Sequence, residues 1–592
     1  MGKIHEKLHD EKLVAGTFYR LLPFQVLMIA INAVNSIVDS LYASNAIGQT
    51  GMSAMGLFAP INHFLYAASM MLVSGSQILY GRYISQDHAH VRSVFSVDLF
   101  VSLLLSLLVS VFMALSALFG WTGVFTSDTA VLSMFNSYLL GQSFGIVPLI
   151  LGQQLFSFLS MENQTRRTMI ASIACLLTNL ILDHTLIVLL NLGTFGLGLA
   201  SSISCWVFLA VQAAYYLSGK SEWKFSLKNC VWKDAASICL LGYPGALSRF
   251  VEMFRCFAVN SLLLAYVGSA GLAAFAASNS LLAIIWAIPF GIVAVARMVF
   301  SISRGEEDRR TLVDIMRVIL FRGTLLMTGI AAALCLLAVP LTRLFIRDVA
   351  SPVYQMTVDG FRILPWCMPL SIFSLSFAAY VQVMEKRIAA LVLPITDGVI
   401  GVVLFSLILI PAIGMNGLYI ANILNGVLCI LLIVVMAWLS NKRFPHSIES
   451  LMAIPDAFGV PKERRMDITV RNMEKVVQIS ETIQQFCAKN SIDAYRSYCA
   501  ALCTEEIAGN IVSHGFSKDQ KKHSVDIRLT CKQDGIVLRI RDDCKAFNPS
   551  EHLKVLHPED GVKNVGIRMV YSLAKEVNYQ NLLDQNVLTI HL

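Results

Sequence analysis

The stretch AIGQTGMSAMGLFAPI, residues 46–61, recurs as YVGSAGLAAFAASNSL, residues 266–281, at an offset of 220 residues. Both copies place small residues at the same positions, pairing Gly48 with Gly268, Gly51 with Gly271, and Ala54 with Ala274. The connections that follow, ISQDHAHVR and SRGEEDRRT, keep this offset, and SMENQTRRT and VMEKRIAAL agree with it to within a residue or two. We therefore expect two similar halves in the same orientation, an arrangement typical of alternating access.

Apolar runs long enough to cross a bilayer surround both copies. The chain of 592 residues is 56% hydrophobic and 14% charged, with a mean hydropathy of +0.64, which is more apolar surface than a soluble core can bury. The run LFVSLLLSLLVSVFMALSALFGW, residues 99–121, is typical and exceeds the roughly 20 residues that a span requires. About twelve spans are predicted, near residues 17–41, 54–80, 94–118, 132–160, 169–190, 196–218, 236–264, 273–299, 315–338, 355–384, 389–410 and 417–440.

Lys and Arg gather in alternate connections, whereas the connections at 41–52, 119–134 and 265–272 contain neither. By the positive-inside rule we expect both termini in the cytoplasm of a bacterial-type inner membrane. The formal net charge of +7 then reflects topology, and no nucleic-acid partner is expected. Thirteen scattered cysteines, without a CxxC pair or a clustered His, fit reduced thiols rather than a disulfide framework or a zinc site.

Three stretches carry a family resemblance: NSIVDSLYASNAIG followed by GMSAMGLFAPI, then LSMENQTRRTMIASIACLLTNLILDHTLI, and GTFGLGLASSIS. Together they resemble the multidrug and toxic compound extrusion (MATE) transporters over roughly residues 10–445. The resemblance implies a V-shaped pair of six-helix lobes that exports organic, often cationic, compounds by antiport against H⁺ or Na⁺.

Carboxylates within the spans are few, and each requires a reason because a charge there costs roughly 2.5–3.5 kcal/mol on insertion scales. Asp39 and Asp183 are expected at similar depth in the first lobe, with Asn179 one helical turn before Asp183. Two carboxylates and an amide suit a proton-loaded pair or a small hard cation. In the resembling family these positions form the cation site, and Ser201 falls where a Thr usually contributes. In the alternative, Asp39 ends its helix at the interface and the other two hydrogen-bond to a neighbour.

The second lobe offers one comparable candidate, Glu252, which lies three residues from both Arg249 and Arg255. It is either neutralised in a local ion cluster or is an acidic contact for substrate or cation facing the cavity. Asp98 and Asp397 lie nearer the cytoplasmic ends of their spans, and we expect both to be solvated interface residues.

Beyond a polar, Pro-punctuated linker at 441–464, the composition becomes that of a soluble α+β domain. Its expected strands are MDITVRN, then a hairpin of SVDIRLT and IVLRIRD that turns at Asp534-Gly535, and a closing pair, VNYQNLL and VLTIHL. Its expected helices are EKVVQISETIQQFCAKN, CTEEIAGNIVSHGF (residues 503–516) and GIRMVYSLAKEV.

This order of motifs resembles the GHKL (Bergerat) ATP-binding fold, particularly its anti-sigma-factor kinase branch, over about residues 465–592. The resemblance implies that Glu506 is a general base and Asn510 a Mg²⁺ ligand beside ATP or ADP. It also implies that Asp542, in RDDCKAFNP, accepts the adenine amine.

The glycines of that family are partly replaced. Cys544 and Ala546 stand at glycine positions on the adenine side, and the phosphate-side loop keeps only Gly566, between Asn564 and Arg568. Because a side chain raises the steric cost of backbone near a phosphate, we expect weak nucleotide binding with slow or absent turnover. ATPase or serine/threonine kinase activity is left open.

The sequence therefore predicts an exporter of small organic, cationic or amphipathic compounds whose cytoplasmic tail is gated by nucleotide or by a regulatory protein. The alternative is a membrane-bound anti-sigma-like serine kinase or signalling receptor that uses the transporter-like part as a sensor. The expected segments are a cytoplasmic N-terminus (1–16), a first lobe (17–218), a second lobe (236–440), a linker (441–464) and an ATP-binding domain (465–592).

Overall fold

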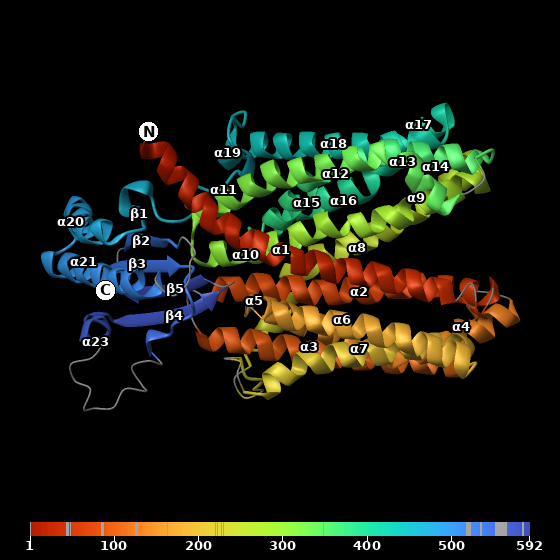
Figure 1. The fold of residues 1–592 in the computed structure, drawn as a ribbon, viewed down its shortest axis with the longest axis horizontal. Helices are drawn as coiled ribbons and strands as arrows, with labels where there is room; N and C mark the ends of the chain where they lie inside the picture. The colour runs from red at the N-terminus through yellow and green to blue at the C-terminus, as the bar shows by residue number, and fades with distance from the viewer. Residues whose placement is uncertain are drawn as a thin grey trace.

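The computed structural model shows a long helical body with a small α+β unit at one end (Figure 1). It describes residues 2–42, 46–47, 49–83, 88–124, 128–162, 164–219, 221, 223–226, 228, 230–346, 349–456, 458–516, 523–532, 535–550, 565–582 and 585–592.

The first half of the helical body occupies one side of Figure 1. Its helices are α1 (Gly2–Tyr42), α2 (Gln49–Tyr83), α3 (His88–Phe119), η2 (Trp121–Val124), α4 (Thr129–Ser143), α5 (Ile146–Met161), α6 (Thr165–Asp183), the π-helical η3 (His184–Leu189) and α7 (Gly193–Leu217).

The second half lies mainly on the other side of the same view. It comprises α8 (Lys233–Tyr266), α9 (Ser269–Ile285), α10 (Ala287–Gly305), α11 (Arg309–Val318), η5 (Ile319–Gly323), α12 (Thr324–Leu336), α13 (Ala338–Phe345), α14 (Pro352–Ile363), η6 (Leu364–Trp366), α15 (Cys367–Val383), α16 (Arg387–Ile395), η7 (Thr396–Ile400), α17 (Gly401–Ile413) and α18 (Met415–Asn441).

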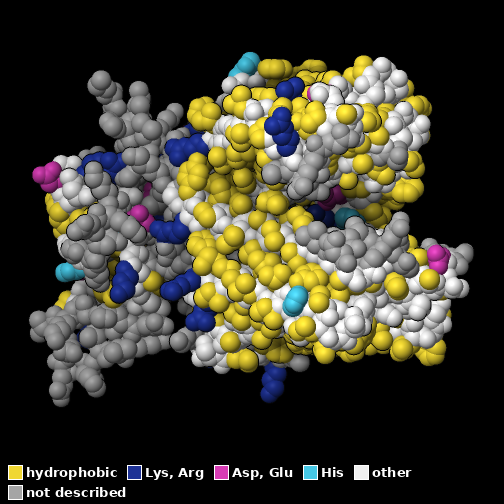
Figure 2. All heavy atoms as spheres, turned by 45° about the vertical axis from the view of Figure 1, so that its right-hand side comes forward, with side chains coloured by type: hydrophobic (Ala, Val, Ile, Leu, Met, Phe, Trp, Pro, Cys, Tyr) yellow, Lys and Arg dark blue, Asp and Glu magenta, His cyan; other side chains and the backbone are white. Residues whose placement is uncertain are grey.

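Within the described residues, ten helical segments are long and apolar enough to cross a membrane, and the bent pair α4 and α5 would be an eleventh. The two members of this pair meet at 45°, so the predicted span 132–160 is broken. The predicted span 236–264 lies within α8, whose charged residues Arg249, Glu252 and Arg255 set it apart from the apolar spans. Hydrophobic side chains cover much of the body in Figure 2, and Lys and Arg gather where it meets the α+β unit.

The repeat in the sequence is also a repeat in structure. Helix α2 begins at Gln49 and α9 begins at Ser269, which preserves the offset of 220 residues. A Cβ on Gly51 would meet Ile47 at 2.4 Å, and a Cβ on Gly271 would meet Val267 at 2.5 Å. Each glycine therefore gives room to the residue four positions earlier. Gly48 lies outside the described residues.

The two halves touch backbone to backbone where α2 meets α8 and α10. A Cβ on Gly242 would lie 1.8 Å from the Met71 carbonyl oxygen, and one on Gly305 would lie 1.7 Å from the Gly81 carbonyl oxygen. Only glycine permits such an approach. Glu385, which follows α15, adds ion pairs to Arg82 and, at 2.9 Å, to Arg304. The halves are therefore held together at the end that carries the α+β unit.

The α+β unit has a fully antiparallel sheet of five strands in the order β1-β2-β3-β5-β4. The strands are β1 (Arg465–Val470), β2 (Val525–Lys532), β3 (Gly535–Asp542), β4 (Glu576–Leu582) and β5 (Gln585–His591). The helices are α20 (Met473–Lys489), α21 (Ala494–Asn510), the π-helical η9 (Ile511–Gly515) and α23 (Val565–Leu573), preceded in the linker by α19 (Ile448–Met452) and η8 (Lys462–Arg464). Every predicted strand and helix of the tail is confirmed, and Asp534 lies outside the described residues.

Apolar and charged side chains alternate along the strands, so the sheet has one apolar face and one charged face. Ile527 and Leu529 of β2 join Leu538 and Ile540 of β3 in a core with α20 and α21. The residues between them point to the other face. On that face Arg528, Arg539 and Arg541 contact the helical body. Asp467 and Asp526, on the same face, pair with Arg528 and Arg539.

We expect Gly305→Ala to lower the stability of the protein by about 1–3 kcal/mol, because the added methyl group cannot fit against the backbone of α2. Thermal unfolding of the purified protein in detergent measures this effect. Gly329→Ala in α12 is the matched control, since nothing lies within 4 Å of its added Cβ. Equal unfolding temperatures for the two variants would contradict the assigned packing.

Candidate functional site

The predicted coupling residues come together in the first half of the helical body, from three helices. Asp39 lies on α1, Asn179 and Asp183 lie on the last turns of α6, and Ser201 lies on α7. The Ser201 hydroxyl donates a hydrogen bond to Asp39 Oδ2 at 3.4 Å, and Asp183 and Asn179 are near enough to Asp39 to interact with its carboxylate. Asp183 is 0% exposed.

Several oxygens of this group are buried without a hydrogen-bond donor among the described residues. They are Asp39 Oδ1, Asn179 Oδ1 and both carboxylate oxygens of Asp183. Unpaired buried acceptors are costly, and one proton or one small cation would satisfy several of them at once. A π-helical turn, η3, directly follows Asp183, and such turns are frequent at functional sites.

The sequence analysis missed Asn35, one turn before Asp39 on α1, whose Oδ1 is likewise buried and has no hydrogen-bond partner in the described part of the chain. The signal in the sequence was its spacing of four residues from Asp39, which places the two side chains on the same face of the helix.

Two expectations for other carboxylates require correction. Asp98 is fully buried, and neither carboxylate oxygen has a hydrogen-bond partner among the described residues, so it is not a solvated interface residue. Asp397 accepts hydrogen bonds from Ser374 at 2.9 Å and Asn425 at 2.8 Å, which makes it part of an internal network between helices. Depth along a helix does not reveal whether the surrounding helices cover a side chain.

Glu252 forms the local ion cluster that its spacing predicts. Its Oε2 accepts a hydrogen bond from Arg249 at 3.0 Å, and its Oε1 lies 3.8 Å from Arg255. All three side chains keep about a third of their surface exposed, so the cluster is also accessible to a ligand.

In the α+β unit, three of the predicted nucleotide-site residues are neighbours. Asn510 Nδ2 donates to Glu506 Oε1 at 2.9 Å on α21. A Cβ on Gly566 would lie 1.7 Å from the same Glu506 oxygen, so the start of α23 rests directly on this carboxylate. The Asn510 amide oxygen is the atom that would bind Mg²⁺. Asn564 lies outside the described residues.

Asp542 ends β3 and is held from two sides. Its Oδ1 accepts hydrogen bonds from the Cys544 backbone N–H at 2.9 Å and from Asn586 Nδ2 at 2.8 Å. Burial raises the pKa of this carboxyl group, and these hydrogen bonds oppose the rise. The role of Asn586, on the neighbouring strand β5, is visible only through the strand register, which pairs it with Asp542.

The charged face of the sheet docks on an acidic connection between α10 and α11. Arg539 donates to Asp308 Oδ2 at 2.9 Å and to Glu306 Oε2 at 2.6 Å. Arg541 donates to the same Glu306 oxygen at 2.6 Å, and Arg528 lies 2.7 Å from Asp308 Oδ1. We call these five residues the docking cluster.

Asp308 is also the N-cap of α11, where its side chain accepts hydrogen bonds from the backbone N–H and the hydroxyl of Thr311. One carboxylate therefore begins a helix of the body and binds the α+β unit.

The linker reinforces this contact. Arg309 donates to Glu449 at 2.6 Å, and Lys386 Nζ donates to the backbone oxygens of Met452 and Ala453 at 2.9 and 2.7 Å. The segment between the helical body and the sheet is thus fixed to α11 and to the start of α16.

Two family models match the chain. The MatE model covers residues 25–185 and 244–407, which is more than half of the chain. The chain belongs to the MatE family. The model described as a histidine kinase-like ATPase domain matches residues 469–592. The resemblances inferred from the sequence are confirmed for both parts.

Curated relatives of this MatE chain include two proteins named probable multidrug resistance protein NorM. The protein from Bradyrhizobium diazoefficiens is 26% identical over 314 residues, which are 50% of the chain and 66% of that relative. The protein from Halalkalibacterium halodurans is 30% identical over 165 residues, which are 26% of the chain and 36% of that relative. The matched region therefore spans just under two thirds of the first relative and about a third of the second.

Solved structures share the fold of the helical body. A crystal structure of MATE in complex with MaL6 has a TM-score of 0.66 at 20% identity and covers 71% of the chain and 96% of its own. An outward-facing multidrug resistance MATE family transporter of the MOP superfamily has a TM-score of 0.65 at 19% identity, covering 70% and 93%. At these identities the likeness shows the fold alone.

In this MatE chain the docking cluster fixes the ionisation of Asp308. Burial alone would raise its pKa, but Arg528, Arg539 and Arg541 outweigh burial and hold the pKa well below its usual value. A carboxylate with a lowered pKa contributes its full stabilisation above its usual pKa and loses it only as the pH falls through the lower folded value.

We therefore expect docking to be unchanged between about pH 5 and pH 8. Dipolar spectroscopy between labels at the exposed residues Ile388 and Glu481 measures the separation of the two parts. Asp308→Asn should lengthen or broaden the distance at every pH, because Asn keeps the N-cap but removes the buried charge. Separation of the wild-type parts near pH 6 would contradict this assignment.

Proposed function

We propose that the chain is a secondary exporter of small organic compounds, cationic or amphipathic, driven by antiport of H⁺ or Na⁺ at Asp39, Asn179, Asp183 and Ser201. The observation that supports this most is the set of buried, unpaired oxygens shared by Asp39, Asn179 and Asp183. In a membrane interior such carboxylates mark ion or proton pathways.

The proposed coupling step uses the closeness of the two carboxylates. Two like charges within reach of each other in a buried site cannot both stay ionised at low cost, so one proton can be shared between Asp39 and Asp183. The same oxygens, with the Asn179 amide, offer the hard donors that Na⁺ would require. Loading and release of this ion would change the charge within the first lobe and so bias the packing of α1 against α6 and α7.

The proposed conformational cycle separates the two halves where they now touch. The close approach of Gly81 to Gly305, with the ion pairs from Glu385, closes the end that carries the ATPase domain. We assign this end to the cytoplasm, since Lys and Arg gather there, and the conformation is then closed toward the cytoplasm.

The proposed regulation acts through the ATPase domain. ATP or ADP with Mg²⁺ would be held by Asn510, with Asp542 reading the adenine amine, and would supply charge and bulk beside α21. Glu506 is hydrogen-bonded to Asn510 and covered by Gly566, which leaves its carboxylate poorly placed to act as a base. We therefore propose that the domain binds nucleotide but does not hydrolyse it or transfer its phosphate at an appreciable rate. The docking cluster would carry the bound state of the domain to α10 and α11.

We expect Asp183→Asn to abolish gradient-driven export while the protein still inserts and folds, because the amide keeps the shape but cannot take up or release a proton. Export from proteoliposomes, driven in turn by an H⁺ and a Na⁺ gradient and screened across organic cations, measures this. Asp359→Asn on α14 is a matched control, since that carboxylate is hydrogen-bonded to Gln355. Wild-type export rates for Asp183→Asn would refute the coupling assignment.

A further inference from the structure

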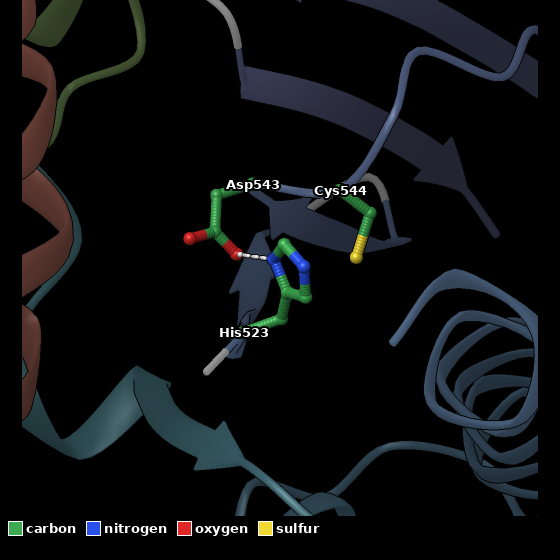
Figure 3. Close-up of side chains that lie close together, drawn as sticks. All are labelled: His523, Asp543 and Cys544. Atoms are coloured by element: carbon green, nitrogen blue, oxygen red, sulfur yellow. Dashed lines mark hydrogen bonds and ion pairs between the residues drawn. The ribbon is translucent and has the colours of Figure 1, made fainter. Parts of the chain in front are cut away.

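A cluster of His, Asp and Cys side chains lies at one end of the central hairpin of the ATPase domain (Figure 3). His523 lies two residues before β2, and Asp543 and Cys544 follow β3 directly. The register pairs Val525 with Asp542, so the strands bring the three residues to the same edge of the sheet. The sequence analysis saw no Cys clustered with His because His523 and Cys544 lie far apart in the sequence and only the strand register brings them together.

The side chains converge closely enough to share an ion. His523 Nδ1 lies 3.1 Å from Asp543 Oδ1, and one donor atom of each residue, including Cys544 Sγ, lies within 4.8 Å of the others. The His523 side chain is 3% exposed and Cys544 is buried, whereas the Asp543 side chain is 31% exposed. Asp543 therefore provides the opening to solvent.

The surrounding chain makes room for the thiol. A Cβ on Gly515, at the end of η9, would lie 3.0 Å from Cys544 Sγ, so a larger residue there would press on the sulfur. The ring of Phe516, the next residue, lies 5.7 Å from the His523 ring. The cluster thus has a defined wall formed by the segment that follows α21.

We propose that His523, Asp543 and Cys544 bind a divalent transition-metal ion of the Zn²⁺ class. Imidazole, thiolate and carboxylate are the three ligand types that Zn²⁺ prefers, and three protein ligands leave a fourth position for water. The thiolate disfavours Mg²⁺, so this site is distinct from the Mg²⁺ position at Asn510. Binding would release the thiol proton and replace the hydrogen bond between His523 and Asp543.

The position of the site suggests what the ion does. Asp543 and Cys544 directly follow Asp542, and the wall residue Gly515 lies five residues after Asn510. An ion would therefore tie together the two segments that carry the candidate nucleotide residues. Cys544 stands where the resembling family has a glycine on the adenine side of its nucleotide site. In this chain the thiol at that position would serve as a metal ligand.

The test is Co²⁺ titration of the full-length protein in detergent, because Co²⁺ occupies Zn²⁺ sites and reports thiolate ligation by a charge-transfer band. We expect one equivalent of Co²⁺ per chain with this band and its loss when Zn²⁺ is added. Cys544→Ala should remove the band, whereas Cys256→Ser, at an exposed cysteine on α8, should keep it. Binding without the band, or an unchanged band in Cys544→Ala, would overturn the proposal.

A second variant covers the case in which Cys544→Ala fails to fold. Asp543 is partly exposed, so Asp543→Asn should fold normally and weaken Co²⁺ binding at least about tenfold while keeping the charge-transfer band. Zn²⁺ should raise the thermal midpoint of the wild-type protein and leave that of Cys544→Ala unchanged. Failure of Zn²⁺ to shift the wild-type midpoint, together with no Co²⁺ band, would leave only a hydrogen-bonded His–Asp pair.

Discussion

One buried carboxylate, Asp308, joins the two parts of this protein. It is 0% exposed, begins α11 as its N-cap, and lies against Arg528 and Arg539 of the sheet. Removing one partner of such a buried pair typically costs about 3–5 kcal/mol, because the remaining charge is left unpaired. The charged face of the sheet and the acidic connection between α10 and α11 meet at this contact.

The same connection lies next to the contact between the two halves of the body. Gly305, whose backbone touches Gly81 of α2, lies only three residues before Asp308. Arg304 precedes it and pairs with Glu385, which also pairs with Arg82. A movement of the ATPase domain that pulls on Asp308 therefore acts on the residues that hold the halves together. This short path is the one through which the proposed regulation of the transporter by its tail would act.

Much of the fold was predictable because it rests on local patterns. The repeat at an offset of 220 residues predicted the equivalent starts of α2 and α9, and the turn at Asp534-Gly535 predicted the flanking strands that include Ile527 and Leu538. The buried polar pair Asn179 and Asp183 could be predicted as a candidate site because these residues lie one turn apart in an apolar helix, and their role in coupling stays a prediction. The docking cluster could not, since Arg539 lies 231 positions from Asp308 and charged strand faces are ordinarily solvated. The burial of Asp98 and the convergence of His523 with Cys544 likewise depend on tertiary packing.

The most direct test is the distance between Leu217, at the end of α7, and Ile388, at the start of α16, with and without Mg·ATP. Both residues are exposed and lie at the end of the helical body near the ATPase domain. Leu217 belongs to the first half of the body and Ile388 to the second. The account predicts that nucleotide changes this distance in the wild-type protein. It predicts no change in Asn510→Ala, which we expect not to bind Mg·ATP, or in Asp308→Asn, which we expect to bind it still. A wild-type response in Asp308→Asn would contradict the account.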